Sequence, residues 1–143
     1  MQLSGHAVTS NTPLRVEISD EGAISVSPAS PAECDPHLYF SAGFLDAQVN
    51  GYRRIDYSAE SLDLDGVHGM VDYLAKSGTT KHFPTIISSP SRTVLRNLEL
   101  LAEAARADPL LKAALPGIHM EGPFIASEDG PRGVHDQEFV RTP

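Results

Sequence analysis

The feature that most constrains the fold is a regular alternation of strand-like and helix-like segments after residue 40. The strand-like runs span 44–50, 80–87 and 117–124, and the helix-like segments, in which apolar residues recur at helical spacing, span 62–77 and 91–106. Strands that alternate with helices through short connections build parallel sheets, because each helix crosses back over one face of the sheet. The sequence therefore predicts an α/β fold with a parallel sheet.

The first forty residues have a different pattern. Residues 14–18 and 23–26 alternate apolar with polar side chains around the turn-forming segment 19–22, which predicts a β-hairpin. The Pro-, Ser- and Ala-rich segment 27–36 is typical of a connector. We therefore expect a small β segment over 1–40 and the α/β part over 41–143.

Composition excludes several classes of function. The chain has 19 acidic and 11 basic residues and a formal net charge of −8, which disfavours binding to nucleic acid or to an anionic membrane. Cys34 is the single cysteine, so an intrachain disulfide is excluded. No apolar run approaches the roughly 20 residues of a membrane span, and no signal-peptide pattern opens the sequence. We expect a soluble, cytoplasmic protein.

Polar residues gather where the predicted strands end. Gln48 and Asn50 close the first strand, Thr85 lies near the end of the second, and Glu121 ends the third. Barrels of the (β/α)8 type hold their active sites at the carboxyl ends of the strands. A doubly wound sheet would normally begin with a glycine-rich phosphate turn, and the sequence has none. This pattern favours the N-terminal part of a (β/α)8 barrel.

The third strand carries the strongest chemical signal. His119 and Glu121 are two residues apart, so they share one face of a strand, and a Gly-Pro turn follows them. A carboxylate at such a strand end is well placed to bind a metal ion. The alternative is an ordinary strand end with a solvated glutamate. For His119, a structural role inside the sheet is favoured over a catalytic one, although it could line the site.

Five ordered motifs resemble the N-acetylglucosamine-6-phosphate deacetylases of the amidohydrolase superfamily, and together they cover about residues 41–143. The motifs are Gly43–Gly51 (GFLDAQVNG), Lys76–Thr80 (KSGTT), Phe83–Ile87 (FPTII), Gly117–Phe124 (GIHMEGPF) and the segment 130–143, which contains Gly133-Val134-His135.

The resemblance implies a metal-dependent hydrolase that converts N-acetylglucosamine 6-phosphate to glucosamine 6-phosphate and acetate. It implies that Glu121 is a ligand of one main divalent metal ion, with zinc as the expected ion, and that Val134 and His135 contact the sugar. Gln48 and Asn50 would line the site in place of the histidines that bind a second metal in other amidohydrolases. A structural role for these two amides, satisfying backbone groups, is equally favoured.

The length of the chain matters for this interpretation. A (β/α)8 barrel has about 250 residues, and the resemblance implies that the general base and two metal-binding histidines come from later strands. We therefore expect three of the eight strand–helix units here, no catalytic residue, and no activity of the chain alone. Two alternatives stay open: a non-catalytic remnant that acts as an interaction module, and an amidohydrolase for another N-acyl sugar. A homodimeric assembly also stays open.

Overall fold

The structure, a computed structural model, describes residues 1–141 and divides the chain into two compact units. The first unit comprises Met1–Ala42, and the second begins at Gly43. The protein is mixed α/β. No helix within the described residues is long and apolar enough to cross a membrane.

The first unit is a four-stranded sheet with the order β3-β2-β1-β4. Its strands are β1 (Gln2–Ala7), β2 (Pro13–Ile18), β3 (Ile24–Pro28) and β4 (Tyr39–Phe40), with the short 3₁₀ helix η1 (Pro31–Glu33) before β4. The predicted hairpin is confirmed, because β2 pairs with β3 in antiparallel register. The sequence did not predict β1, since its polar and glycine residues break the apolar alternation, nor the two-residue β4.

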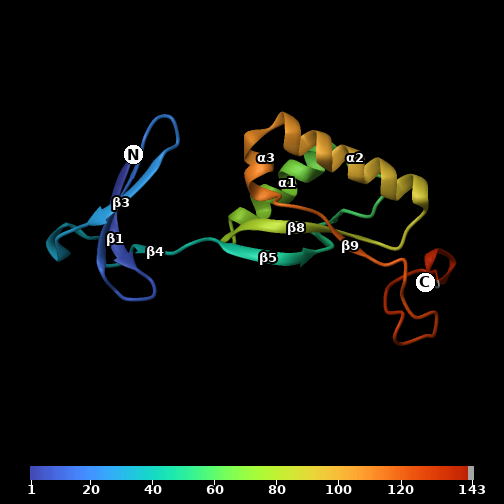
Figure 1. Ribbon diagram of the computed structural model, residues 1–143. Coiled ribbons are helices and arrows are strands. Elements are labelled where there is room, and N and C mark those ends of the chain that lie inside the picture. The colour runs from blue at the N-terminus through green and yellow to red at the C-terminus, as the bar shows by residue number, and fades with distance from the viewer. Residues whose placement is uncertain (142–143) are drawn as a thin grey trace. The chain divides into compact units, whose positions relative to one another are not determined.

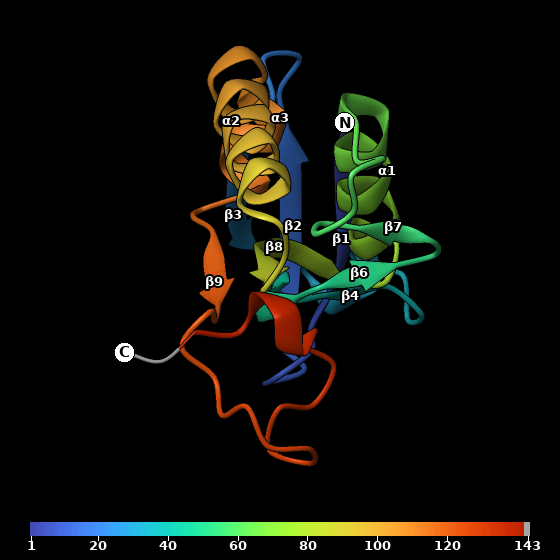
Figure 2. The same ribbon diagram turned by 90° about the vertical axis from the view of Figure 1, so that its right-hand side faces the viewer.

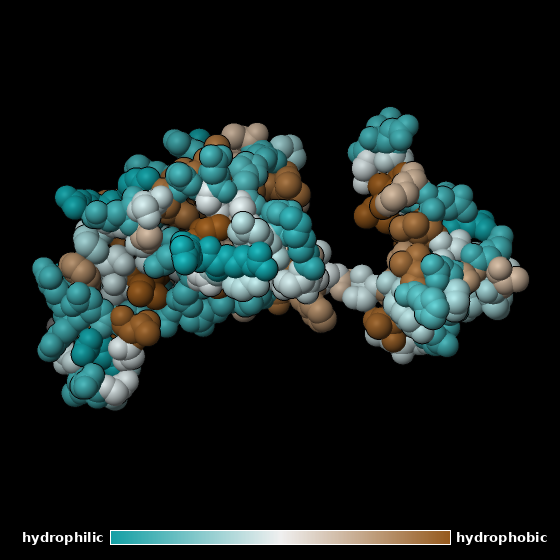
Figure 3. All heavy atoms as spheres, turned by 180° about the vertical axis from the view of Figure 1, so that it is seen from behind, coloured by the Kyte–Doolittle hydropathy of each residue, from teal (hydrophilic) through white to brown (hydrophobic). Residues whose placement is uncertain are grey.

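Burial differs sharply between the two units. The cluster of buried apolar side chains lies entirely in the second unit. In the first unit, by contrast, Leu3, Val8, Ile24 and Val26 are all exposed, and Figure 3 shows apolar atoms on its surface. The small sheet is therefore held by its strand pairing rather than by a core within the unit.

The second unit contains the predicted parallel sheet. Strand β8 (Thr79–Ile87) lies between β5 (Phe44–Val49) and β9 (His119–Glu121), and both pairings are parallel. A separate hairpin, β6 (Gly51–Tyr52) with β7 (Ile55–Asp56), follows β5. Parallel pairing places the carboxyl ends of the three strands at one edge of the sheet, where Glu121 lies.

Three helices cover one face of this sheet (Figure 1). They are α1 (Leu64–Ala75), α2 (Ser91–Ala107) and α3 (Pro109–Ala114), and α1 packs beside the other two (Figure 2). Asp63 caps α1 by accepting a hydrogen bond of 2.8 Å from the Gly66 N–H. Gly78 follows α1 in the left-handed conformation, with φ of 93°, as the sequence predicted.

The buried stripe of α2 differs from the one that the sequence predicted. Apolar periodicity indicated the stripe Val94, Leu95, Leu98, Leu101, Ala102 and Ala105. Leu101 is buried as predicted, and Val94 and Leu98 are partly buried against the core. The structure also buries Thr93, Asn97 and Ala104, whereas Leu95 is 60% exposed. Polar residues can face the core here because they are hydrogen-bonded: the Asn97 side-chain amide donates to the carbonyls of Tyr57 and Ala59.

The third strand ends where the sequence predicted. Strand β9 contains His119–Glu121, so Glu121 is its last residue, and β9 begins two residues after the start of the strand-like run 117–124. Gly122 has φ of 92° and Pro123 has no backbone N–H, so the ladder stops after Glu121.

A buried polar pair lies beneath the helices. His82, which is 1% exposed, meets the Tyr57 hydroxyl through its Nε2 at 2.7 Å. Burial lowers the pKa of His82 to about 4, against a smaller opposing effect of Asp46. Burial also raises the pKa of Tyr57. The two rings therefore stay neutral around pH 7.

We predict that His82 makes the fold sensitive to acid. Above pH 6.5 its imidazole is neutral in both the folded and the unfolded chain; between pH 6.5 and about 4 only the unfolded chain binds the proton. The free energy of unfolding should therefore decrease as the pH is lowered through this window, by at most roughly 3 kcal/mol. Urea unfolding at pH 7.5 and 4.5 measures the loss.

The variant His82→Gln should lose this part of the pH dependence. His37→Gln is the control, because His37 is an exposed histidine of the first unit. An equal loss of stability with pH in wild type and His82→Gln would contradict the prediction.

Candidate active site

Glu121, the last residue of β9, lies at the centre of a hydrogen-bonded group at the carboxyl edge of the parallel sheet. Its Oε2 accepts N–H bonds from the side-chain amides of Gln48 at 2.9 Å and Asn50 at 3.1 Å. Its Oε1 lies 3.4 Å from Nε2 of His135. Residues up to 73 positions apart therefore converge on one carboxylate.

The electrostatics of this group favour the ionised carboxylate. The hydrogen bond from Asn50 lowers the pKa of Glu121 below its ordinary value; partial burial acts in the opposite direction; and His135 and His119 lower the pKa further. With its side chain 29% exposed, Glu121 keeps access to solvent. The Glu121 carboxylate is therefore fixed by hydrogen bonds and remains accessible to solvent.

His135 reaches Glu121 from the loop that follows β9. Its side chain is 4% exposed, and its Nδ1 lies 3.0 Å from the Ser88 hydroxyl. The Arg132 guanidinium donates to the His135 carbonyl at 2.6 Å, which fixes the backbone of the loop. His135 is therefore an ordered, buried group. Val134 beside it is 81% exposed.

His119 lies two residues before Glu121 in β9, so the two side chains are on the same face of the strand. Its Nδ1 is 3.3 Å from the hydroxyl of Thr85, the residue with which it pairs on β8. This contact gives the imidazole a partner inside the sheet.

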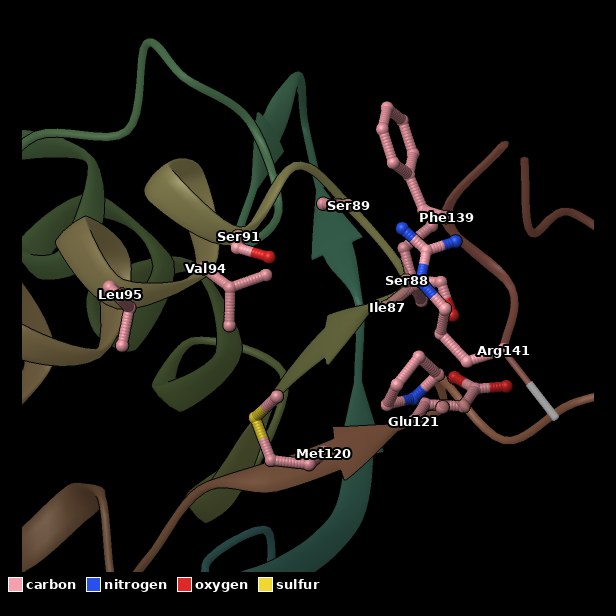
Figure 4. Close-up of a pocket in the computed structure, with 12 residues that line it drawn as sticks. Ile87, Ser88, Ser89, Ser91, Val94, Leu95, Met120, Glu121, Phe139 and Arg141 are labelled. Atoms are coloured by element: carbon pink, nitrogen blue, oxygen red, sulfur yellow. The ribbon is translucent and has the colours of Figure 1, made fainter. Parts of the chain in front are cut away.

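A hollow of about 320 Å³ opens beside Glu121. Figure 4 shows Ser88, Glu121 and Arg141 on one side of it, with Met120 and Val94 on another. Val94 belongs to α2, and Met120 points to the face of β9 opposite Glu121, so the hollow lies on the side of α2. Its lining does not include Gln48, Asn50 or His135, so the hollow adjoins the hydrogen-bonded group around Glu121 and does not contain it.

The group is incomplete as a metal site within residues 1–141. No set of three or more His, Cys, Asp or Glu side chains in this part of the chain is close enough together to hold a metal ion. Catalytic zinc sites use about three protein ligands and one water. Glu121 can supply one anionic oxygen ligand, and the described residues do not supply the others.

The structure brings Glu121, Gln48, Asn50 and His135 together, and it places His119 and Val134 nearby. Whether Val134 and His135 contact a substrate stays a prediction. Sequence reasoning did not identify Ser88 or Arg132. The position of Ser88 directly after β8 was a usable signal, because strand ends in parallel sheets carry functional groups.

We predict that Asn50→Leu raises the pKa of Glu121 towards its ordinary value, because the variant removes the N–H donor that contributes most to the shift. Carbon-13 NMR titration of the glutamate carboxyl groups measures this directly. Gln2→Leu, which replaces an exposed amide in the first unit, is the control and should leave the titration of Glu121 unchanged. An unaltered Glu121 titration in Asn50→Leu would show that Asn50 does not stabilise the carboxylate.

Comparison with known proteins finds similar sequences among the N-acetylglucosamine-6-phosphate deacetylases. No known family model matches the chain. The N-acetylglucosamine-6-phosphate deacetylase of Danio rerio is 36% identical over 112 residues, which cover 77% of this chain and 26% of that protein. The Caenorhabditis elegans protein of the same name is 34% identical over 109 residues, which cover 73% of this chain and 25% of that protein.

A solved structure supports the likeness of the fold. The N-acetylglucosamine-6-phosphate deacetylase of Thermotoga maritima matches with a TM-score of 0.76 at 23% identity, over 100% of this chain and 37% of that one. The chain spans about a quarter of the length of the curated relatives that it matches. The predicted resemblance is thus confirmed: over most of its length, the chain is similar to a portion of the N-acetylglucosamine-6-phosphate deacetylases.

Proposed function

We propose that this chain forms part of a metal-dependent hydrolase that cleaves the N-acetyl amide of N-acetylglucosamine 6-phosphate, giving acetate and glucosamine 6-phosphate. The observation that carries the proposal is the Glu121 carboxylate, held at a strand end by Gln48, Asn50 and His135. The names of the relatives support the reaction and the substrate.

The chemistry explains why such a carboxylate is useful. An amide is a poor electrophile, and a bound zinc or similar ion would lower the pKa of a water molecule from its bulk value to about 7. Glu121 would supply one anionic ligand, and the remaining ligands and the general base would come from residues beyond those described. Gln48 and Asn50 fix the carboxylate in position through Oε2.

The architecture fits the same proposal. The strands β5, β8 and β9 are parallel and consecutive in the sheet, and helices cover one face. We infer that they are the first three strands of a (β/α)8 barrel, in which the carboxyl edge carries the active site. His135 and Val134 would then lie in the loop after the third strand, beside the substrate.

The proposal is tested with a chimera in which residues 43–143 replace the matched segment of the Danio rerio deacetylase. We expect the chimera to release acetate from N-acetylglucosamine 6-phosphate, and we expect Glu121→Gln to lower both the rate and the zinc content, the rate by at least about a hundredfold. Glu128→Gln is the matched control, because Glu128 is an exposed carboxylate in the same loop.

Elemental analysis, circular dichroism and an acetate assay are made on each chimera. Full zinc occupancy with a near-normal rate in Glu121→Gln would refute the role of this carboxylate. Turnover of another N-acyl sugar in preference to N-acetylglucosamine 6-phosphate would reassign the substrate.

We further predict that the 143-residue chain alone releases no acetate, even with added zinc. The reason is that the described residues hold no cluster of three metal-ligating side chains. Acetate release and zinc binding by isothermal titration calorimetry measure this. Zinc-dependent turnover by the chain alone would show that its own residues complete the site.

A further inference from the structure

We infer that Ser88 is a positioning residue that fixes the imidazole of His135 in the tautomer with its proton on Nε2. In this form His135 presents a single N–H donor to Glu121. The inference concerns residues of this chain alone.

The hydrogen-bond partners of Nδ1 determine its state. The backbone N–H of Ser88 points at Nδ1 from 3.4 Å, and an N–H group can only donate. Nδ1 must therefore carry a lone pair. The Ser88 hydroxyl, 3.0 Å away, then donates to the same atom. One residue thus supplies two donors to one ring nitrogen.

The partner of the other nitrogen agrees with this tautomer. In a neutral imidazole whose Nδ1 accepts, the proton is on Nε2, which lies 3.4 Å from the carboxylate oxygen Oε1 of Glu121. Ser88 is 8% exposed and His135 is 4% exposed, which leaves little room for water to replace these partners. The contacts at Nδ1 therefore set the proton position, and the contact at Nε2 agrees with it.

The backbone around Glu121 makes room for this arrangement. Gly122 has φ of 92°, and a Cβ on it would lie 2.2 Å from Ser88 Oγ and 3.5 Å from His135 Nδ1. A larger residue at 122 would displace the serine hydroxyl. The glycine after Glu121 thus leaves the space in which Ser88 contacts His135.

The consequence for ligand binding rests on the proposed function. With Nδ1 occupied by Ser88, the only proton that His135 can donate is on Nε2, which faces Glu121 at 3.4 Å, and a ligand oxygen would accept it by sharing or replacing that contact. His135 would recognise an acceptor oxygen, such as a hydroxyl, carbonyl or phosphate oxygen, and it would not serve as a metal ligand through Nδ1. The structure thereby assigns His135 the role of a hydrogen-bond donor whose direction Ser88 sets.

The test is side-chain nitrogen-15 NMR of the 143-residue chain at pH 8. In the wild type we expect the His135 proton on Nε2. Ser88→Ala should lower the ratio of this tautomer to the other by about tenfold, since one hydrogen bond is lost. Ser88→Thr should restore it, because threonine keeps the hydroxyl. Ser89→Ala, the matched control, should have no effect.

A wild-type spectrum with the proton on Nδ1, or with both tautomers equally populated, would overturn the inference, as would an unchanged ratio in Ser88→Ala. If Ser88→Ala fails to fold, the wild-type and Ser88→Thr spectra decide between these outcomes. The measurement needs neither metal nor turnover. An inactive chimera would therefore count against the proposed function and leave the tautomer assignment standing.

Discussion

The central strand β8 is the constraint on which both the core and the candidate site depend. It pairs with β5 on one side and β9 on the other. Because side chains alternate along a strand, Ile86 enters the apolar core while Thr85, on the opposite face, meets His119. Ser88 follows the strand directly and meets His135. A shift of β8 by one residue would exchange these faces and disrupt the core and the polar group together.

The sheet also accommodates a proline in its central strand. Pro84 on β8 is paired with Val49, and the register between β5 and β8 shifts between Asp46 and Val49. A proline cannot donate a ladder hydrogen bond, so an irregularity next to it costs less than it would in a regular ladder. The shift lies just before Asn50. The irregular pairing beside Pro84 therefore lies at the end of β5 from which Gln48 and Asn50 reach Glu121.

The sequence predicted the elements with strong periodicity and missed those that depend on tertiary contacts. The parallel strands, α1 and the hairpin β2–β3 follow from local patterns of apolar residues. The burial of Asn97 could not be predicted, because its partners are backbone carbonyls 38 and 40 residues away. The same holds for His82, whose partner Tyr57 lies in the segment after β7. A polar residue in the core is explained only by its partner, which the local sequence does not reveal.

The candidate site shows the same division. Glu121, Gln48 and Asn50 were identifiable because strand ends in a parallel sheet must converge. The position of His135 depends instead on the closure of a loop, in which the Arg141 N–H donates to the Pro123 carbonyl at 2.8 Å and Arg132 holds the His135 carbonyl. Closing a loop of this size costs only a few kcal/mol and little more for each added residue. A few such hydrogen bonds, worth about 1 kcal/mol each, together with the burial of His135, can offset that cost. The geometry at Glu121 is therefore set by a rigid part, the sheet, and by a loop whose order depends on a small number of contacts.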